Sequence, residues 1–324
     1  METLSDQELL TLNQQGLIPG PDESESAFCQ RVAQAKSLSL ETDPSLGKPC
    51  LLQELYPSSA SGKNQAFITQ QLFDIFPSWV PVFFSNYQLF PWQGGCAWFY
   101  QLSEEGPMEA CFQLRKQFAN SARYLGIYSR DELIAHESVH IGRMLFEEPK
   151  FEEILAYRTA TSAFRRWFSP IVQSSKESLL FVLVLLLTML LEFFFLLYEI
   201  SDTMHLILGL KSLLVMGVAL GVARLWKRQR QFKKCLEVVE KAVHEKQKAL
   251  AVVYRLTDQE IINFSHFSSA QIKEYIESQR TQSLRWRVIS LAYCKNLRLN
   301  LNAEDAEDAE ITKSFNSHKN EIKF

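Results

Sequence analysis

The chain has 324 residues, with 34 Lys and Arg against 37 Asp and Glu, six His and six Cys. A formal charge of -3 leaves no surplus of cations to neutralise phosphates, so no nucleic-acid partner is predicted. The content of 47% hydrophobic residues excludes a wholly disordered chain, and the lack of any C-x-x-C pair argues against a thiolate zinc site.

Residues 1–65 predict a polar region with short helices. Ser5-Asp6-Gln7-Glu8 has the capping-box pattern that opens a helix. A second helix is expected over residues 26–36, where Phe28, Val32 and Ala35 recur at helical spacing. The segment 57–62 is rich in turn residues, so a loop is expected before the next region.

Residues 66–175 predict a small α+β domain. The first part is aromatic and interrupted by prolines, and it holds three runs typical of short strands, at residues 82–84, 96–100 and 110–115. We expect a small antiparallel sheet with a helix packed on its apolar face.

Two helices are expected after the strands. Ser129 and Glu132 repeat the capping-box spacing, so the first helix is predicted from Arg130 to about Phe146, ahead of Pro149. Pro149 suits the first position of a second helix, which is expected to reach Phe168. That helix would place Ala156, Ala160 and Ala163 on or near one face.

The first of these helices contains His136-Glu137-Ser138-Val139-His140, which fits the H-E-x-x-H pattern. The i, i+4 spacing puts both imidazoles one turn apart on one face, so both can reach a single ion. Glu137 lies beside them, where it can take a proton from a metal-bound water. Two hydrogen-bonded helix histidines without a metal are the alternative. The remaining histidines have no metal-ligand spacing: His205, His244, His266 and His318.

A catalytic zinc site needs a third protein ligand. Arg143 and Phe146 stand where a metzincin has Gly and His, which excludes that class. The segment 152–157, Glu-Glu-Ile-Leu-Ala-Tyr, resembles the downstream Glu helix of the gluzincins, a resemblance that covers about residues 105–165.

The gluzincin resemblance implies Zn²⁺ held by His136, His140 and Glu153, with Tyr157 in place of the usual acidic residue next to the ligands. Glu152 is the next candidate for the third ligand, ahead of the pair at 147–148. One residue's shift turns a helical side chain by about 100°, so Glu152 is expected to point away from the site.

The resemblance also implies a zinc metalloendopeptidase, in which Glu137 activates a zinc-bound water. An extended peptide or protein substrate would add to a sheet edge, for which residues 110–115 are the candidate. Tyr157 and Tyr128 are the candidates for stabilising the oxyanion. Membrane proteases of the prenyl-protein type are related, but they place transmembrane helices between the H-E-x-x-H helix and the third ligand.

Residues 178–225 predict a transmembrane helical hairpin. The stretches 178–198 and 205–225 have 21 residues each and are nearly all apolar, enough to cross about 30 Å of hydrocarbon. Two buried core helices are the alternative, but a soluble helix should show a polar stripe.

Basic residues flank the outer ends of this hairpin and are missing from its connecting turn. The positive-inside rule therefore predicts a multi-pass protein with both termini in the cytoplasm. The acidic, polar start predicts no cleavable signal peptide. Glu192 and Lys211 each lie about 9 Å below the same surface at 1.5 Å rise per residue, so we expect them to form an intramembrane ion pair.

Residues 226–300 predict a C-terminal helical domain, with an amphipathic segment over 232–253 and further helix starts at Thr257 and Ser268. The acidic segment 301–324 is expected to be disordered. Residues 1–65 and 226–300 resemble uncharacterised chlamydial membrane proteins, which implies a bacterial inner membrane.

Two functions from different classes follow. The first is a membrane-anchored zinc metallopeptidase that cuts peptide bonds at the cytoplasmic face. The second is a non-catalytic membrane scaffold, similar to chlamydial inclusion-membrane proteins, in which residues 226–300 and the acidic tail bind partners. The sequence leaves the substrate and the oligomeric state open.

Overall fold

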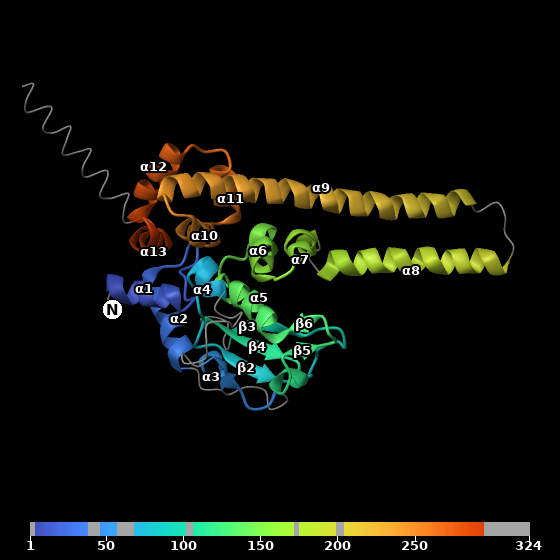
Figure 1. Ribbon diagram of the computed structural model, residues 1–324, viewed down its shortest axis with the longest axis horizontal. Coiled ribbons are helices and arrows are strands. Elements are labelled where there is room, and N and C mark those ends of the chain that lie inside the picture. Colours follow the sequence, from blue (N-terminus) through green and yellow to red (C-terminus); the bar gives the residue numbers. More distant parts are fainter. Residues whose placement is uncertain are drawn as a thin grey trace, which may run out of the picture.

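A computed structural model describes residues 4–37, 46–56, 68–101, 106–171, 175–198 and 204–294. It shows a mixed α-helix and β-sheet body from which two long helices project side by side (Figure 1). The α+β expectation is confirmed at this level, whereas a zincin-like domain stays a prediction. Three expected features lie outside the described residues: the loop at 57–62, the hairpin turn at 199–203 and the tail at 301–324.

The N-terminal region forms α1 (Asp6–Gln14) and α2 (Glu25–Ser37), as expected. The capping box at α1 is confirmed, because Ser5 Oγ accepts from the Glu8 amide at 3.3 Å and the Glu8 carboxylate accepts from the Ser5 amide at 2.9 Å. Both helices bury apolar side chains against the C-terminal part of the chain, in a cluster that includes Leu9, Phe28 and Val288. The short helices α3 (Leu52–Leu55) and α4 (Ile68–Phe73) follow.

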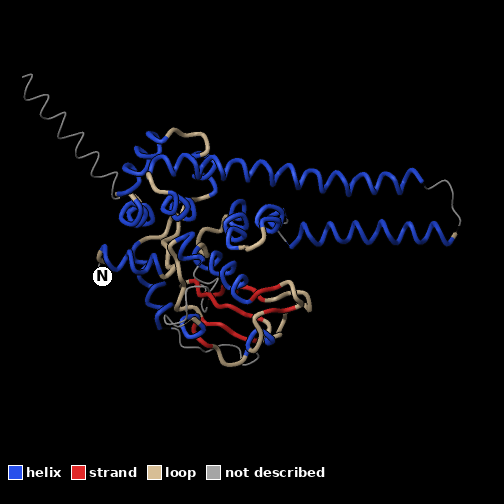
Figure 2. The backbone as a smooth tube through the Cα atoms, viewed as in Figure 1, coloured by secondary structure: helices blue, strands red, loops and turns tan. Residues whose placement is uncertain are grey.

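The main sheet has four strands in the order β1-β2-β4-β3, drawn in red in Figure 2. They are β1 (Cys50–Leu51), β2 (Pro81–Phe84), β3 (Gly95–Gln101) and β4 (Met108–Leu114). The β2–β4 pair is parallel, so the expectation of an antiparallel sheet is wrong in part. The expectation that residues 110–115 form an edge is also wrong: β4 lies between β2 and β3 because its apolar run is buried almost throughout. The edges are β1 and the half-exposed β3.

A second, two-stranded hairpin joins β5 (Arg123–Tyr124) to β6 (Tyr128–Ser129) and leads directly into α5 (Arg130–Gly142). Helix α5 packs on the apolar face of the main sheet, where Ile134 and Ile141 meet Ala110 and Phe112.

Helix α5 begins at Arg130 as predicted, but its N-terminal cap and its end differ from the prediction. The predicted capping box does not form: the Ser129 side chain makes no cap hydrogen bond, and the Glu132 carboxylate, the expected acceptor for the Ser129 amide, accepts from Arg165 at 2.8 Å instead. The helix ends four residues before Phe146, where the buried Arg143 leaves it to donate to the carbonyls of residues 254 and 256.

The predicted helix 149–168 is broken. It consists of α6 (Pro149–Ala156), a 3₁₀ turn (Tyr157–Thr159), and α7 (Ala163–Phe168), which a second 3₁₀ turn (Ser169–Ile171) follows. The Thr159 hydroxyl donates to the Ala156 carbonyl at 2.7 Å and so competes with the helical ladder there. Ala160 is extended, so the expected row of alanines on one face does not form.

The two projecting helices are α8 (Ser175–Leu197) and α9 (Met204–Val243). Both are long and apolar enough to cross a membrane, and almost nothing of their apolar stretches is buried inside the protein. Exposed apolar side chains cover them without a polar stripe, which excludes the alternative of two buried core helices.

Helix α9 is a single unbroken helix of 40 residues that begins in the projecting hairpin and continues into the body. It ends at Val243, and His244, with a φ of 60°, reverses the chain into α10 (Lys246–Tyr254). The amphipathic segment expected over 232–253 is therefore two helices. The predicted starts at Thr257 and Ser268 are confirmed as capped N-termini of α11 (Asp258–Phe264) and α12 (Ser269–Arg280), and α13 (Leu284–Tyr293) follows.

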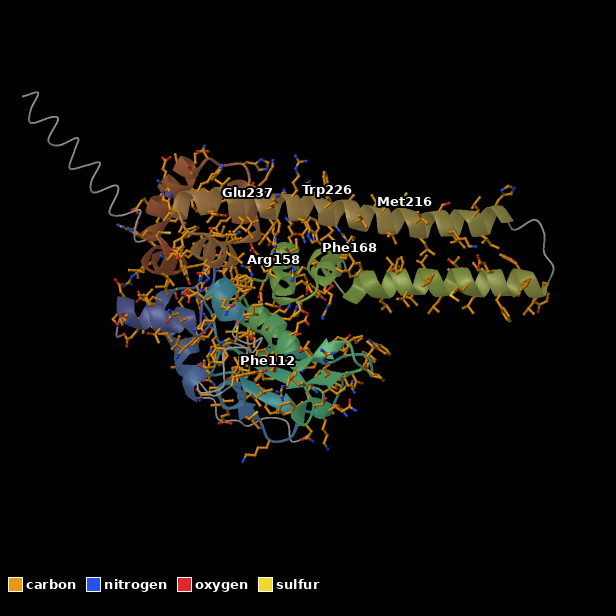
Figure 3. The ribbon with its side chains drawn as sticks, viewed as in Figure 1. Phe112, Arg158, Phe168, Met216, Trp226 and Glu237 are labelled. Carbon is orange, nitrogen blue, oxygen red and sulfur yellow. The ribbon has the colours of Figure 1, made fainter. Side chains whose placement is uncertain are left out.

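The largest hydrophobic cluster combines residues from both sides of the hairpin, among them Val139, Phe151, Phe232 and Val252. Figure 3 shows Arg158 between α6 and α9, and its guanidinium carbon lies 4.9 Å from the ring centre of Phe232. The segments before and after the hairpin therefore share one core, which holds α5 and α6 against α9 and α10.

Candidate metal centre

His136 and His140 lie one turn apart on α5 with their rings facing one another. Their Nε2 atoms are 3.3 Å apart, and both side chains are largely buried. The helical spacing thus brings both ring nitrogens to one point, as the H-E-x-x-H pattern predicts.

Glu153 of α6 reaches the same point. Its Oε2 lies 3.8 Å from His136 Nε2, and its Oε1 lies 3.7 Å from His140 Nε2. A tetrahedral zinc ion with bonds of about 2.0–2.1 Å keeps its ligand atoms roughly 3.3 Å apart, so the three residues fit such an ion. Within the described part of the chain, these are the residues whose ligand atoms converge in a group able to hold a metal ion.

Glu152 also contacts His140, but from the opposite side of the ring. Its Oε1 lies 2.7 Å from His140 Nδ1. The Glu152 side chain therefore lies away from the shared ligand position, but it still contacts His140, which the sequence did not predict. Helix α6 lies against α5 with His140 between Glu152 and Glu153. His136 likewise hydrogen-bonds the carbonyl of Ala156. Such partners on the outer nitrogen fix the tautomer and orientation of a metal-binding histidine.

Burial and nearby charges shift the pKa values of the two histidines in opposite directions. Burial lowers the pKa of His136, and the positive charges of His140 and Arg165 add to that effect. Burial also acts to lower the pKa of His140, but the hydrogen bond that its Nδ1 donates to Glu152 and the charges of the surrounding carboxylates outweigh burial and raise that pKa to about 9. In the metal-free protein at neutral pH, His140 is therefore the histidine that is protonated on both ring nitrogens.

Glu137 is held between α5 and the edge strand. Its Oε2 accepts from the backbone amide of Ala97 in β3 at 2.9 Å. Burial raises the pKa of its carboxyl group, while His140 and the Ala97 amide act in the other direction. A carboxylate with a raised pKa is suited to accepting and returning a proton near neutral pH.

A pocket of about 140 Å³ opens beside His136 and Glu137. Both candidates for the oxyanion role, Tyr157 and Tyr128, line it. The ring of Tyr157 stands edge-on to His136, with 4.6 Å between ring centres. Arg165 of α7 lines the same pocket, and sequence reasoning missed it because it lies outside any motif.

The C-terminal helices position both helices that carry the candidate ligands. The Tyr254 hydroxyl donates to the Val139 carbonyl at 2.8 Å, and a Cβ at Gly142 would lie 2.2 Å from that hydroxyl oxygen, so α5 and α10 approach closely only because residue 142 is glycine. Asp258 of α11 accepts from the amides of Lys150 and Phe151 at the start of α6. The position of Glu153 thus depends on a residue more than 100 positions later in the chain.

The weaker ligand candidates lie elsewhere. Glu147 is exposed at a backbone φ of 50°, and Glu148 accepts from the Asp258 amide at 2.5 Å. His205, His244 and His266 belong to no metal-binding group among the described residues, and His318 lies outside them.

No protein-family model, curated protein or solved structure matches the chain.

Proposed function

We propose that the protein is a membrane-anchored zinc-dependent metallopeptidase of the gluzincin type. One observation carries the proposal: two histidine nitrogens and a glutamate carboxylate converge within 3.3–3.8 Å, while the outer side of each ring already has an acceptor. A structural pair of histidines needs no such convergence of three donors, whereas a catalytic zinc site uses three protein ligands and leaves one position open.

The residues around this centre have different roles in the proposed reaction. A zinc ion bound there would polarise the peptide carbonyl and acidify water. Glu137 accepts a proton at its carboxylate and returns it to the leaving amine, while the Ala97 amide keeps that carboxylate in place. Tyr157 and Tyr128, which both line the pocket beside His136 and Glu137, are the proposed donors to the oxyanion.

The edge strand β3 is the part of the sheet to which an extended peptide would add. It runs beside α5 and has no strand on its outer side among the described residues, and its Trp98 and Phe99 are exposed. Main-chain hydrogen bonds to such an edge bind peptides with little dependence on their side chains. The substrate is therefore a peptide or protein segment in extended conformation.

The membrane part of the proposal is supported by α8 and α9. Arg165 and Arg166 precede the hairpin, and a basic cluster over 224–234 follows it. By the positive-inside rule, this pattern supports the proposal that both soluble parts lie on the cytoplasmic side of a bacterial inner membrane. Labelling of tags at positions 10, 202 and 315 by an impermeant reagent tests this. Label at 202 alone supports the topology, and label at 10 moves the metal centre to the outer side.

The experiment that tests the function uses the full-length protein in detergent. We expect about one zinc ion per chain and cleavage of an unfolded protein substrate that a chelator stops. His136→Ala and His140→Ala should lose zinc and cleavage together, and His266→Ala is the matched control. A protein that binds no zinc would overturn the peptidase proposal in favour of a non-catalytic scaffold.

A further inference from the structure

The position of the body relative to the projecting hairpin is set at the start of α8. Helix α7 leads through residues 169–171 to α8, and there Ile171 packs against α9, since a methyl group at Gly221 would lie 3.5 Å from its side chain. Trp226, exposed on α9, lies at the same end of the hairpin as Phe168 (Figure 3). Tryptophan followed by basic residues is typical of the level of the lipid headgroups.

Helix α7 has an apolar face that is largely exposed. Phe164, Trp167 and Phe168 follow the i, i+3, i+4 spacing and are all exposed. The two arginines between them point the other way: Arg165 donates to Glu132, and Arg166 donates to the carbonyl of Ala160. The apolar face is therefore turned away from the body.

The β5–β6 hairpin presents a second exposed apolar group. Leu125 and Ile127 at its turn are 60% and 67% exposed. Leu125 has a φ of 51°, a left-handed conformation that favours Gly or Asn, so a leucine there stabilises neither the turn nor the core. In Figure 1 this hairpin lies on the side of the body from which α8 and α9 project.

Residues next to both groups line the metal pocket. Its lining includes Tyr128, which follows Ile127, and Arg165, which follows Phe164. We propose that Leu125, Ile127, Phe164, Trp167 and Phe168 form an interfacial patch that dips into the lipid bilayer and holds the mouth of the metal pocket at the boundary between water and lipid.

The bilayer is the occupant that the surroundings favour. The α7 part of the patch is continuous in sequence with α8, and the basic residues Arg224, Lys227 and Arg230 of α9 lie at the same end of the hairpin, where they complement anionic headgroups. A helix with an apolar aromatic face and arginines on the other side is typical of one that lies in the interface, with its apolar face about 5–10 Å below the headgroups.

The test measures depth and needs neither metal nor catalysis, so it is separate from the test of the peptidase. The full-length protein carries Cys29→Ser, Cys50→Ser and Cys96→Ser, and an environment-sensitive dye is attached at Ile127→Cys, Leu187→Cys or Ser278→Cys. Each form is placed in vesicles of phosphatidylethanolamine and phosphatidylglycerol with nitroxides either near the headgroup or deep in the acyl chain.

We expect dye at 127 to be quenched mainly by the shallow nitroxide, dye at 187 in α8 by the deep one, and dye at the exposed Ser278 of α12 by neither. Leu125→Asn, which suits the positive φ, should keep the fold but reduce the quenching at 127. Quenching at 187 without any at 127 overturns the patch alone. No quenching at either position overturns both the patch and the membrane anchor.

Discussion

The Glu152 carboxylate lies 2.7 Å from Nδ1 of His140, so the ring whose Nε2 faces the metal position is held from behind by an anion. The two adjacent glutamates of α6 thus lie on opposite sides of one histidine, because Glu153 lies on the Nε2 side of the same ring. This contact makes Glu152 a positioning residue.

Glu152→Gln is therefore expected to weaken zinc binding by about 10–100-fold, the usual effect of removing a carboxylate partner of a metal-binding histidine. Glu153→Gln removes a ligand and should lower affinity much further. Competition with a chelator of known affinity measures both. Glu147→Gln, at an exposed position in the preceding turn, is the control, and equal affinities for Glu152→Gln and wild type would contradict the assigned role.

Glu137→Gln should keep the zinc ion and lose activity. The amide oxygen of glutamine can still accept from the Ala97 amide, so the local structure is retained, but the proton acceptor is gone. Loss of a general base lowers turnover by about 10²–10⁴-fold. Zinc content and peptide cleavage are measured on the same sample, and loss of zinc in this variant would show that Glu137 is a ligand.

Zinc binding at pH 7 should release close to one proton per ion. A pKa of about 9 means that His140 is protonated before the ion binds, and a zinc ligand must be neutral. Affinity should accordingly rise as the pH increases towards 9 and fall as it decreases. Calorimetry in buffers with different ionisation heats counts the protons. Fewer protons are expected for Glu152→Gln, because its loss removes the hydrogen bond that raises this pKa.

Exchanging the charges of Glu192 and Lys211 should restore an insertion that either single reversal impairs. Their Oε1 and Nζ atoms lie 2.5 Å apart between α8 and α9, as the sequence predicts. A lone charge in this region costs on the order of 2.5–3.5 kcal/mol. A glycosylation-based insertion assay measures the effect, with the neutral change Ser212→Ala as the control in the same turn. Failure of the double reversal would leave the pair without a role in insertion.

The rate of cleavage should depend more on whether the substrate lies at the bilayer surface than on its amino-acid sequence. If the interfacial patch places the pocket at the bilayer surface, a peptide tethered to vesicles by an acyl chain should be cut faster than the same peptide in solution. Tethering raises the local concentration at the pocket mouth. Leu125→Asn should reduce this ratio while cleavage of the soluble peptide stays the same. Equal rates for both peptides in the wild type would contradict the prediction.

The sequence predicted the local features well. The capping boxes at Ser5, Thr257 and Ser268 form because their partners lie three residues away. The convergence of His136, His140 and Glu153 also follows from helical spacing and one tight turn. The end of α5 and the break after Ala156 were not predictable in this way. They depend on Arg143 bonding to carbonyls more than 100 residues later and on Thr159 turning its hydroxyl onto the helix.

The edge of the sheet was missed for a related reason. Strand order is a property of tertiary packing, and the apolar run at 108–114 is compatible with an edge or a centre until its neighbours are known. Arg165 was missed because no motif marks it, although it lines the metal pocket from a helix that the sequence merged with α6.

The unbroken course of α9 has a mechanical consequence. At 1.5 Å per residue, its 40 residues form a rod of about 60 Å, part of it projecting and part of it packed in the core. A helical hairpin adapts to a thicker or thinner bilayer mainly by changing its tilt. Because α9 has no joint where it enters the body, such a tilt must rotate the whole body with it. In a chain that spans the bilayer as proposed, bilayer thickness is thereby coupled to the angle between the candidate metal centre and the lipid surface.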